Sequence, residues 1–293
     1  MTTKTIITRL GCAALLLGGC DVKDPIHDTP HPDSGRITLV TEWHDCSAGT
    51  GIPATYTVKV GEYSATVSGT TVTVDHLFEP GNYRLVVHNT PDAITVNGTV
   101  ATAAAAATPA GQTGTFIHAT PGWLHAGVTN VAIEKDKEHT VTVVAHQQTR
   151  QLTLVIEPAG GTAGKIESIE GTLSGVAGTL DIDAGTCTAP SNVALAFTKI
   201  TDGANTGKWS ATVRLLGVAD GQQRLNAKIR FTGDTPTPVT LDSDLSTALA
   251  AFNTDKHMPV TLDGAVVETP TGAVLSATIT DWNPVNGSPV VAD

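Results

Sequence analysis

The sequence predicts an all-β fold, with two β-sandwich domains in tandem behind a signal peptide and a tether. Short segments rich in Thr, Val and Ile alternate with turn residues along most of the chain, as in residues 56–60 and 71–74. This spacing is typical of antiparallel strands in sandwiches. Residues 36–43 and 151–158 also share a Thr-Leu-Val core and a Glu at matched positions. Each reads as the opening strand of a domain, with chance similarity between two strands as the alternative.

The first nineteen residues have the layout of a secretory signal peptide. A basic start at Lys4 and Arg9 is followed by an apolar stretch over residues 10–17 and then by Cys20. The apolar stretch is far shorter than the roughly 20 residues that span a bilayer. Its end, Leu-Gly-Gly-Cys, resembles the lipobox of bacterial lipoproteins, in which the cysteine thiol accepts diacylglycerol. We expect residues 1–19 to be removed and Cys20 to carry the lipid.

Residues 20–34 are expected to form a tether, because they are rich in Asp, Pro and His and lack periodicity. Removing the two basic residues of the signal peptide leaves 17 − 2 = 15 Lys and Arg against 28 Asp and Glu. Such an acidic chain repels nucleic acid and anionic membrane surfaces. Membrane attachment must therefore come from the lipid. Residues 21–24 resemble the Lys-acidic signal that sends lipoproteins of Bacteroidetes-type bacteria to the outer face of the outer membrane.

We expect an N-terminal β-sandwich domain over residues 35–147 and a C-terminal one over residues 148–293. Strands are clearest where apolar and polar residues alternate. In residues 224–231 the apolar side chains take one face and the charged or amide side chains take the other. The alanine run at residues 103–107 is expected to be a variable loop or a strand edge.

One helix is expected near the C-terminus. Asp242 or Ser243 can cap it, and it would end before Pro259. Its apolar residues at helical spacing are Leu245, Leu249 and Phe252. We expect this helix to cover one end of the C-terminal sandwich.

The sequence predicts no enzyme. The chain has no Gly-x-Ser-x-Gly elbow for a catalytic serine. It has no Cys-x-x-Cys pair that would indicate zinc. The glycine-rich residues 160–164 lack the Lys-Ser/Thr of a phosphate-binding loop. We therefore expect no catalytic residue, no metal ligand, no cofactor and no small-molecule substrate.

Cys46 and Cys187 are the cysteines of the mature chain after Cys20, one in each expected domain. In an oxidising compartment they could form a disulfide. Their separate domains and turn-like surroundings favour two unpaired thiols, and the pairing is left open. The tether histidine His31, close to Asp33, is expected to be solvated.

Several phrases of the chain together resemble one family, the fimbrial anchor and minor fimbrillin (FimB-like) lipoproteins of Bacteroidetes-type bacteria. The phrases occur in the same order over most of the mature chain and include residues 77–83, 121–123, 147–154, 173–178 and 280–282. The resemblance implies two transthyretin-like β-sandwich domains in tandem and a structural role in fimbriae. It also implies that the partners are other fimbrial subunits and that no active site should be expected.

The resemblance also implies a way to distinguish two kinds of subunit. Fimbrillins that polymerise are thought to be cut after a basic residue, so that the lipid and the first strand leave and a neighbour's strand fills the groove. Such a cut needs a Lys or Arg between the first two strands. Residues 44–55 contain neither, and the nearest basic residues are Arg36, before the first strand, and Lys59, inside the second. An anchor that keeps its lipid and first strand is therefore favoured.

The final strand is one candidate for donation to a neighbouring subunit. The alternative is that it only completes its own sheet, and the sequence does not decide between the two. The residues of this possible partner strand are Ala277, Thr278, Ile279, Thr280, Asp281 and Trp282.

A glycan-binding surface lipoprotein is the alternative function. Sugars stack on exposed aromatic rings, and the chain has four tryptophans. Trp123 lies in a turn-like segment and is the best candidate for such a platform. Trp43, Trp209 and Trp282 begin or end strands, where core packing would use them.

Overall fold

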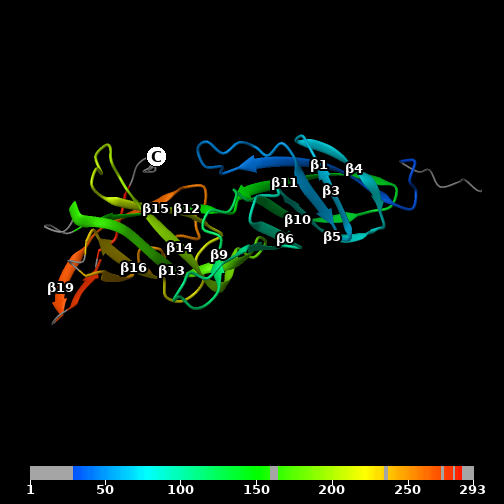
Figure 1. Cartoon of the computed structure of the whole chain (residues 1–293). Helices are drawn as coiled ribbons and strands as arrows, with labels where there is room; N and C mark the ends of the chain where they lie inside the picture. The colour runs from blue at the N-terminus through cyan, green and yellow to red at the C-terminus, as the bar shows by residue number, and fades with distance from the viewer. Residues whose placement is uncertain (1–28, 159–163, 234–236, 272–273, 280, 286–293) are drawn as a thin grey trace, which may run out of the picture.

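The computed structural model describes residues 29–158, 164–233, 237–271, 274–279 and 281–285. The predicted signal peptide, the lipidation site Cys20 and most of the tether lie outside these residues. The described chain consists of strands and turns without an α-helix, which confirms the predicted all-β class. The strands form two sheets, a near-barrel and a curled half-barrel (Figure 1).

The near-barrel is a seven-stranded sheet with the order β3-β2-β5-β10-β11-β1-β4. Its strands alternate between buried and exposed positions, as the periodicity of two requires. The apolar side enclosed by the sheet is one hydrophobic core that includes Ile37, Leu39 and Val58. The strands are β1 (Gly35–His44), β2 (Tyr56–Val60), β3 (Tyr63–Val67), β4 (Thr71–Phe78), β5 (Gly81–His88), β10 (His125–Ile133) and β11 (Lys137–Gln147).

The half-barrel is the larger sheet, and its main path has the order β19-β20-β17-β16-β13-β14-β15-β12-β18-β21. It encloses a second hydrophobic core, separate from the first. The predicted alternation in residues 224–231 is confirmed, because every second side chain there is buried. The strands are β12 (Arg150–Glu157), β13 (Ile166–Asp181), β14 (Thr186–Lys199), β15 (Trp209–Leu215), β16 (Arg224–Phe231), β17 (Val239–Asp244), β18 (Val260–Ala265), β19 (Val267–Thr271), β20 (Val274–Thr278) and β21 (Asn283–Pro284).

Four short strands cross from the first half of the chain into the second sheet. They follow β5 and precede β10 in sequence, yet β7 pairs with β13 and β9 pairs with β14. They are β6 (Ile94–Asn97), β7 (Val100–Ala103), β8 (Ala105–Ala106) and β9 (Phe116–Ile117). The alanine run is therefore a strand edge, one of the two predicted states. The chain therefore passes between the two sheets at residues 88–94 and 117–125 as well as at residues 147–150.

The predicted helix near the C-terminus is wrong. Asp242 and Ser243 belong to β17, and residues 246–253 form consecutive turns. In a helix, the carbonyl groups of this segment would accept hydrogen bonds from main-chain N–H groups one turn later. Here the buried guanidinium of Arg150 binds several of them instead. Its Nη1 donates to the carbonyls of Ala251, Phe252 and Thr254, at 3.0, 2.8 and 2.6 Å. The apolar residues of the segment are nevertheless buried, as predicted: Leu245, Leu249 and Phe252.

The described chain begins at one end of the molecule, and β19 lies at the opposite end (Figure 1). The end of the tether is attached to the turn before β11. Thr29 donates to the Asp136 carboxylate through its main-chain N–H at 2.9 Å and its hydroxyl at 2.8 Å.

Candidate assembly strands

The first strand, β1, lies inside the near-barrel and is paired along both sides. It runs parallel to β11 without a break and antiparallel to β4. The side chains of Ile37 and Leu39 are fully buried, and Thr41 is buried beside them. Removing β1 would therefore open a long apolar groove between β4 and β11.

Arg36 lies within β1, between Glu138 of β11 and Leu77 of β4. The prediction that it precedes the first strand is wrong, because pairing already begins at Gly35. Lys59 lies inside β2, as predicted. A cut after Arg36 would release the tether and leave most of β1 in place. The sequence between β1 and β2 offers no Lys or Arg at which a basic-specific protease could release the whole strand.

The terminal segment, defined as residues 277–282, lies against the half-barrel. Ala277 pairs with Leu241 of β17 in parallel, and β21 just beyond the segment pairs with β18. The side chains of Ala277, Ile279 and Trp282 are buried, whereas Asp281 is exposed. Thr280 lies outside the described residues. In this structure the segment completes its own sheet, which was one of the two alternatives.

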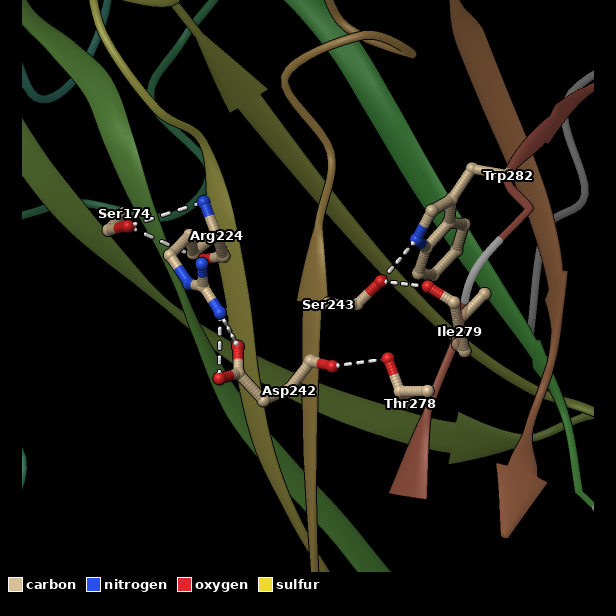
Figure 2. A network of polar contacts seen from close by, with 7 residues as sticks. All are labelled: Ser174, Arg224, Asp242, Ser243, Thr278, Ile279 and Trp282. Atoms are coloured by element: carbon tan, nitrogen blue, oxygen red, sulfur yellow. Dashed lines mark hydrogen bonds and ion pairs between the residues drawn. The ribbon is translucent and has the colours of Figure 1, made fainter. Parts of the chain in front are cut away.

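Side chains of β17 hold the terminal segment in place (Figure 2). The Ser243 hydroxyl donates to the Ile279 carbonyl and accepts from Trp282 Nε1 at 2.9 Å. The Thr278 hydroxyl donates to the Asp242 carbonyl at 2.8 Å. Asp242 and Ser243, which the sequence suggested as helix caps, therefore bind the terminal segment instead.

The outer end of this network is an exposed ion pair. Arg224 Nη2 donates to both carboxylate oxygens of Asp242 at 2.8 Å, and this hydrogen bond to Asp242 raises the pKa of Arg224. The Arg224 main-chain N–H also donates to the Ser174 hydroxyl at 3.3 Å. These contacts fix β16, β17 and β13 relative to one another, next to the seat of the terminal segment.

Gly264 of β18 makes room for the two large side chains of the terminal segment. A Cβ atom at this position would lie 2.5 Å from Ile279 Cγ2 and 3.1 Å from Trp282 Cε3. These distances are shorter than ordinary van der Waals contacts. The seat of Ile279 and Trp282 therefore depends on a glycine at position 264. Nothing in the spacing of residues along the chain indicates this requirement.

The four tryptophans do not form an open aromatic platform. Trp209 and Trp282 are buried, and Trp43 is half-buried, with its ring edge against Tyr56 at 5.4 Å between centroids. Trp123 is half-buried, and the Arg214 guanidinium lies 4.9 Å from its ring centroid. Arg214 thus occupies a face of the ring that a sugar would use.

Cys46 and Cys187 are both free thiols in the structure, the state that the sequence favoured. Burial raises the pKa of the Cys187 thiol, which lies in the hydrophobic core of the second sheet.

The expectation for His31 is wrong, because its ring is buried and its Nδ1 lies 2.8 Å from the Ser34 carbonyl. Within the described ranges, no group of three or more His, Cys, Asp or Glu side chains is placed to hold a metal ion. The same part of the chain has no helix with the length and apolar character of a membrane span.

Solved structures share this two-sheet fold. The fimbrial anchor protein Mfa2 from Porphyromonas gingivalis matches with a TM-score of 0.52 and 12% identity, over 83% of this chain and 95% of that one. A candidate adhesin from Bacteroides ovatus matches with a TM-score of 0.55 and 13% identity, over 87% and 96%. A candidate polysaccharide-binding protein from Bacteroides thetaiotaomicron matches with a TM-score of 0.54 and 12% identity, over 86% and 98%. At such identities the likeness concerns the fold. A comparison with curated protein sequences gives no match.

The sequence itself defines the family. The profile of the Fimbrillin-A associated anchor proteins Mfa1 and Mfa2 matches residues 57–287. Because this match covers well over half of the chain, the chain belongs to this family of fimbrial anchor proteins. The family is not enzymatic, and the predicted resemblance to fimbrial anchors is confirmed.

Proposed function

We propose that this chain is a lipoprotein of the outer membrane that anchors fimbriae to the cell surface or serves as an accessory subunit of fimbriae. The observation that carries the proposal is the retained first strand. β1 is paired on both sides, and no basic residue separates it from β2. Because no basic-specific cut can release this strand whole, the groove stays closed, as expected of an anchor rather than of a polymerising subunit.

The position of the tether supports this role. Thr29 is attached to Asp136 at the near-barrel end, and β19 lies at the other end of the molecule. A lipid on Cys20 would therefore place the half-barrel farther from the membrane. The chain passes between the two sheets at residues 88–94, 117–125 and 147–150, so a pull on the half-barrel is transmitted to the near-barrel and its tether through the covalent main chain. This is a suitable construction for a protein that holds a fibre.

Contacts with other fimbrillins would be made through β-strands. The terminal segment is the candidate partner strand on this chain, because its alternate residues Ala277 and Ile279 are apolar and would fill a groove in a neighbour. Only two residue pairs join β20 to β17 in the described chain. On its other side β20 pairs with β19, while Ser243 and the space above Gly264 hold Ile279 and Trp282. Exchange of the segment would require these side-chain contacts to break.

Replacing the lipid-bearing residue tests the proposal. In a strain with Cys20→Ala, we expect the protein to leave the outer-membrane fraction and fimbriae to be shed into the medium. A matched strain with Cys46→Ala keeps the lipid and should retain its fimbriae. Electron microscopy of cells and immunoblots of the medium measure both. Normal retention of fimbriae in the Cys20→Ala strain would contradict the anchoring role.

The state of the first strand gives a second measurement. Mass spectrometry of the chain isolated with fimbriae should find a lipidated N-terminus at Cys20. A chain that starts downstream of Val40 on assembled fibres would show that β1 is removed. The chain would then be a polymerising subunit rather than an anchor.

A further inference from the structure

The near-barrel has two edge strands, β3 and β4, which follow one another in sequence but do not pair. Each is hydrogen-bonded to a neighbour on one side only, and no backbone hydrogen bond joins the two among the residues that the structure describes. An unpaired strand edge is a template for another chain unless charges, proline or a bulge protect it. The two edges differ in this protection.

The edge of β4 is protected. Its register with β1 breaks, so that Val74, Asp75 and His76 stand opposite Ile37 alone. Such a bulge bends the strand, and Asp75 adds an exposed charge. The outer strands of the half-barrel are protected in other ways. β19 contains Glu268 and Pro270, and the strands β6, β8 and β21 are only two to four residues long.

The edge of β3 has none of these protections. It pairs with β2 without a break from Tyr63 to Val67 and contains neither charge nor proline. The two strands are joined by a two-residue turn, so the flanking residues Val60 and Tyr63 form a hydrogen-bonded pair. Pairs alternate along an antiparallel ladder. Ser64 and Thr66 therefore direct their main-chain N–H and C=O groups outward, and both residues are exposed.

The core beneath β3 is already filled. The Tyr63 ring stacks on His76 of β4 with 4.9 Å between centroids. At the other end of β3, the Tyr56 hydroxyl donates to the Gly69 carbonyl at 2.8 Å, and the Thr41 N–H donates to Thr70 at 2.8 Å. An added strand would not need to supply a core side chain. It would need an extended main chain with small, uncharged residues beside Ser64 and Thr66.

A second copy of this chain does not fit the edge. The sheet order and strand directions make β3 run in the same sense as β1. A two-fold dimer through this edge is antiparallel. It would turn the two β1 strands, and hence the two tethers, in opposite directions. The described N-terminal ends would then point in opposite directions, which is unfavourable for two copies that are anchored in one membrane.

We propose that the outer edge of β3 accepts an extended, uncharged segment of a neighbouring fimbrial subunit by β-augmentation. This inference rests on the proposed anchoring function, which makes fimbrial subunits the partners of this chain, and on β1, which keeps the central groove closed. The affinity comes from the outward main-chain groups of Ser64 and Thr66. The site is thus distinct from both β1 and the terminal segment.

The test compares two substitutions of Thr66 in the full-length lipidated chain. Thr66→Pro removes the outward N–H but leaves the hydrogen bonds between β3 and β2, whereas Thr66→Ala keeps the N–H. The lost bond leaves a partner carbonyl unpaired, so we expect subunit binding to weaken about tenfold in Thr66→Pro and to be unchanged in Thr66→Ala. Equal binding by two variants with matched melting temperatures would overturn the proposal.

A photo-crosslinking amino acid gives a readout that does not depend on folding differences. Placed at Ser64, it should form a crosslink to a fimbrial subunit, identified by mass spectrometry of the joined peptides. Placed at Glu138, an exposed position on β11, it should form none. No crosslink at Ser64 in fimbriated cells would overturn the proposal.

Cell-bound fimbriae separate this inference from the proposed function. If Cys20→Ala releases fimbriae and Thr66→Pro releases them as well, both stand. If only Cys20→Ala releases them, the anchoring role stands and the role of β3 is wrong. If neither does, the anchoring function is wrong, and the β3 proposal falls with it.

Discussion

β1 and the terminal segment are both strands that a fimbrial subunit could exchange, yet they are held in different ways. β1 is paired with β11 along its whole length and with β4 from Gly35 to Val40, and the side chains of Ile37 and Leu39 are fully buried. The terminal segment pairs with β19 at Ala277 and Thr278 but is joined to β17 by few main-chain pairs, and Ser243 and Gly264 hold its later residues Ile279 and Trp282. β1 is therefore an integral part of its sheet. The terminal segment can be weakened by single side-chain changes outside it.

The largest effect is expected from emptying the core under β1. Leu39→Ala should lower the free energy of unfolding by about 3 kcal/mol, because a fully buried leucine is replaced by a cavity. Val40→Ala, at the half-buried neighbouring position, should cost clearly less. Denaturant unfolding followed by tryptophan fluorescence measures both. Equal losses would mean that β1 is not anchored by its inward face.

A methyl group at position 264 should loosen the terminal segment. Gly264→Ala forces Ile279 and Trp282 to move, at a cost of about 2 kcal/mol. Hydrogen exchange should increase in peptides that cover residues 277–282 and stay unchanged in β1. Ala265→Ser, on the exposed side of the same strand, is the control. Faster exchange in β1 would show that the two regions are coupled.

Removing the Ser243 hydroxyl should have a smaller effect on the same segment. Ser243→Ala leaves the Ile279 carbonyl and the Trp282 indole N–H without this partner, at a cost of about 1.5 kcal/mol. Ser174→Ala, at the outer end of the network, should change stability less. Thermal unfolding of the two variants tests this order. A larger loss in Ser174→Ala would contradict the assignment of Ser243 as the main contact.

The smallest expected effect is a dependence of folding stability on pH that arises from two histidines of the near-barrel. Burial lowers the pKa of His125 and of His88 below the ordinary value. The unfolded chain therefore binds protons more readily, so stability should fall as the pH drops below about 6.5 and stay level above it. His125→Leu should reduce this dependence. Unfolding measured between mildly acidic and neutral pH tests it, and an unchanged slope in His125→Leu would exclude His125 as a source.

The sequence predicted local features more successfully than long-range ones. Alternation in residues 224–231 and the place of Lys59 inside a strand depend on neighbouring residues, and both are confirmed. The helix expected from Leu245, Leu249 and Phe252 failed because Arg150, about a hundred positions away, binds the carbonyls of that segment. Periodicity reports which side chains are buried. It does not report where the main-chain groups find their partners.

The sequence by itself determined the all-β class, the absence of a basic residue between the first two strands, and the membership of a fimbrial anchor family. Only the tertiary structure decided that residues 94–117 pair with the second sheet and that Ser243 holds Trp282. The physical reason is the nature of β-structure. Each strand can satisfy its main-chain groups with any suitably placed neighbour, so the choice of neighbour depends on how the whole chain packs.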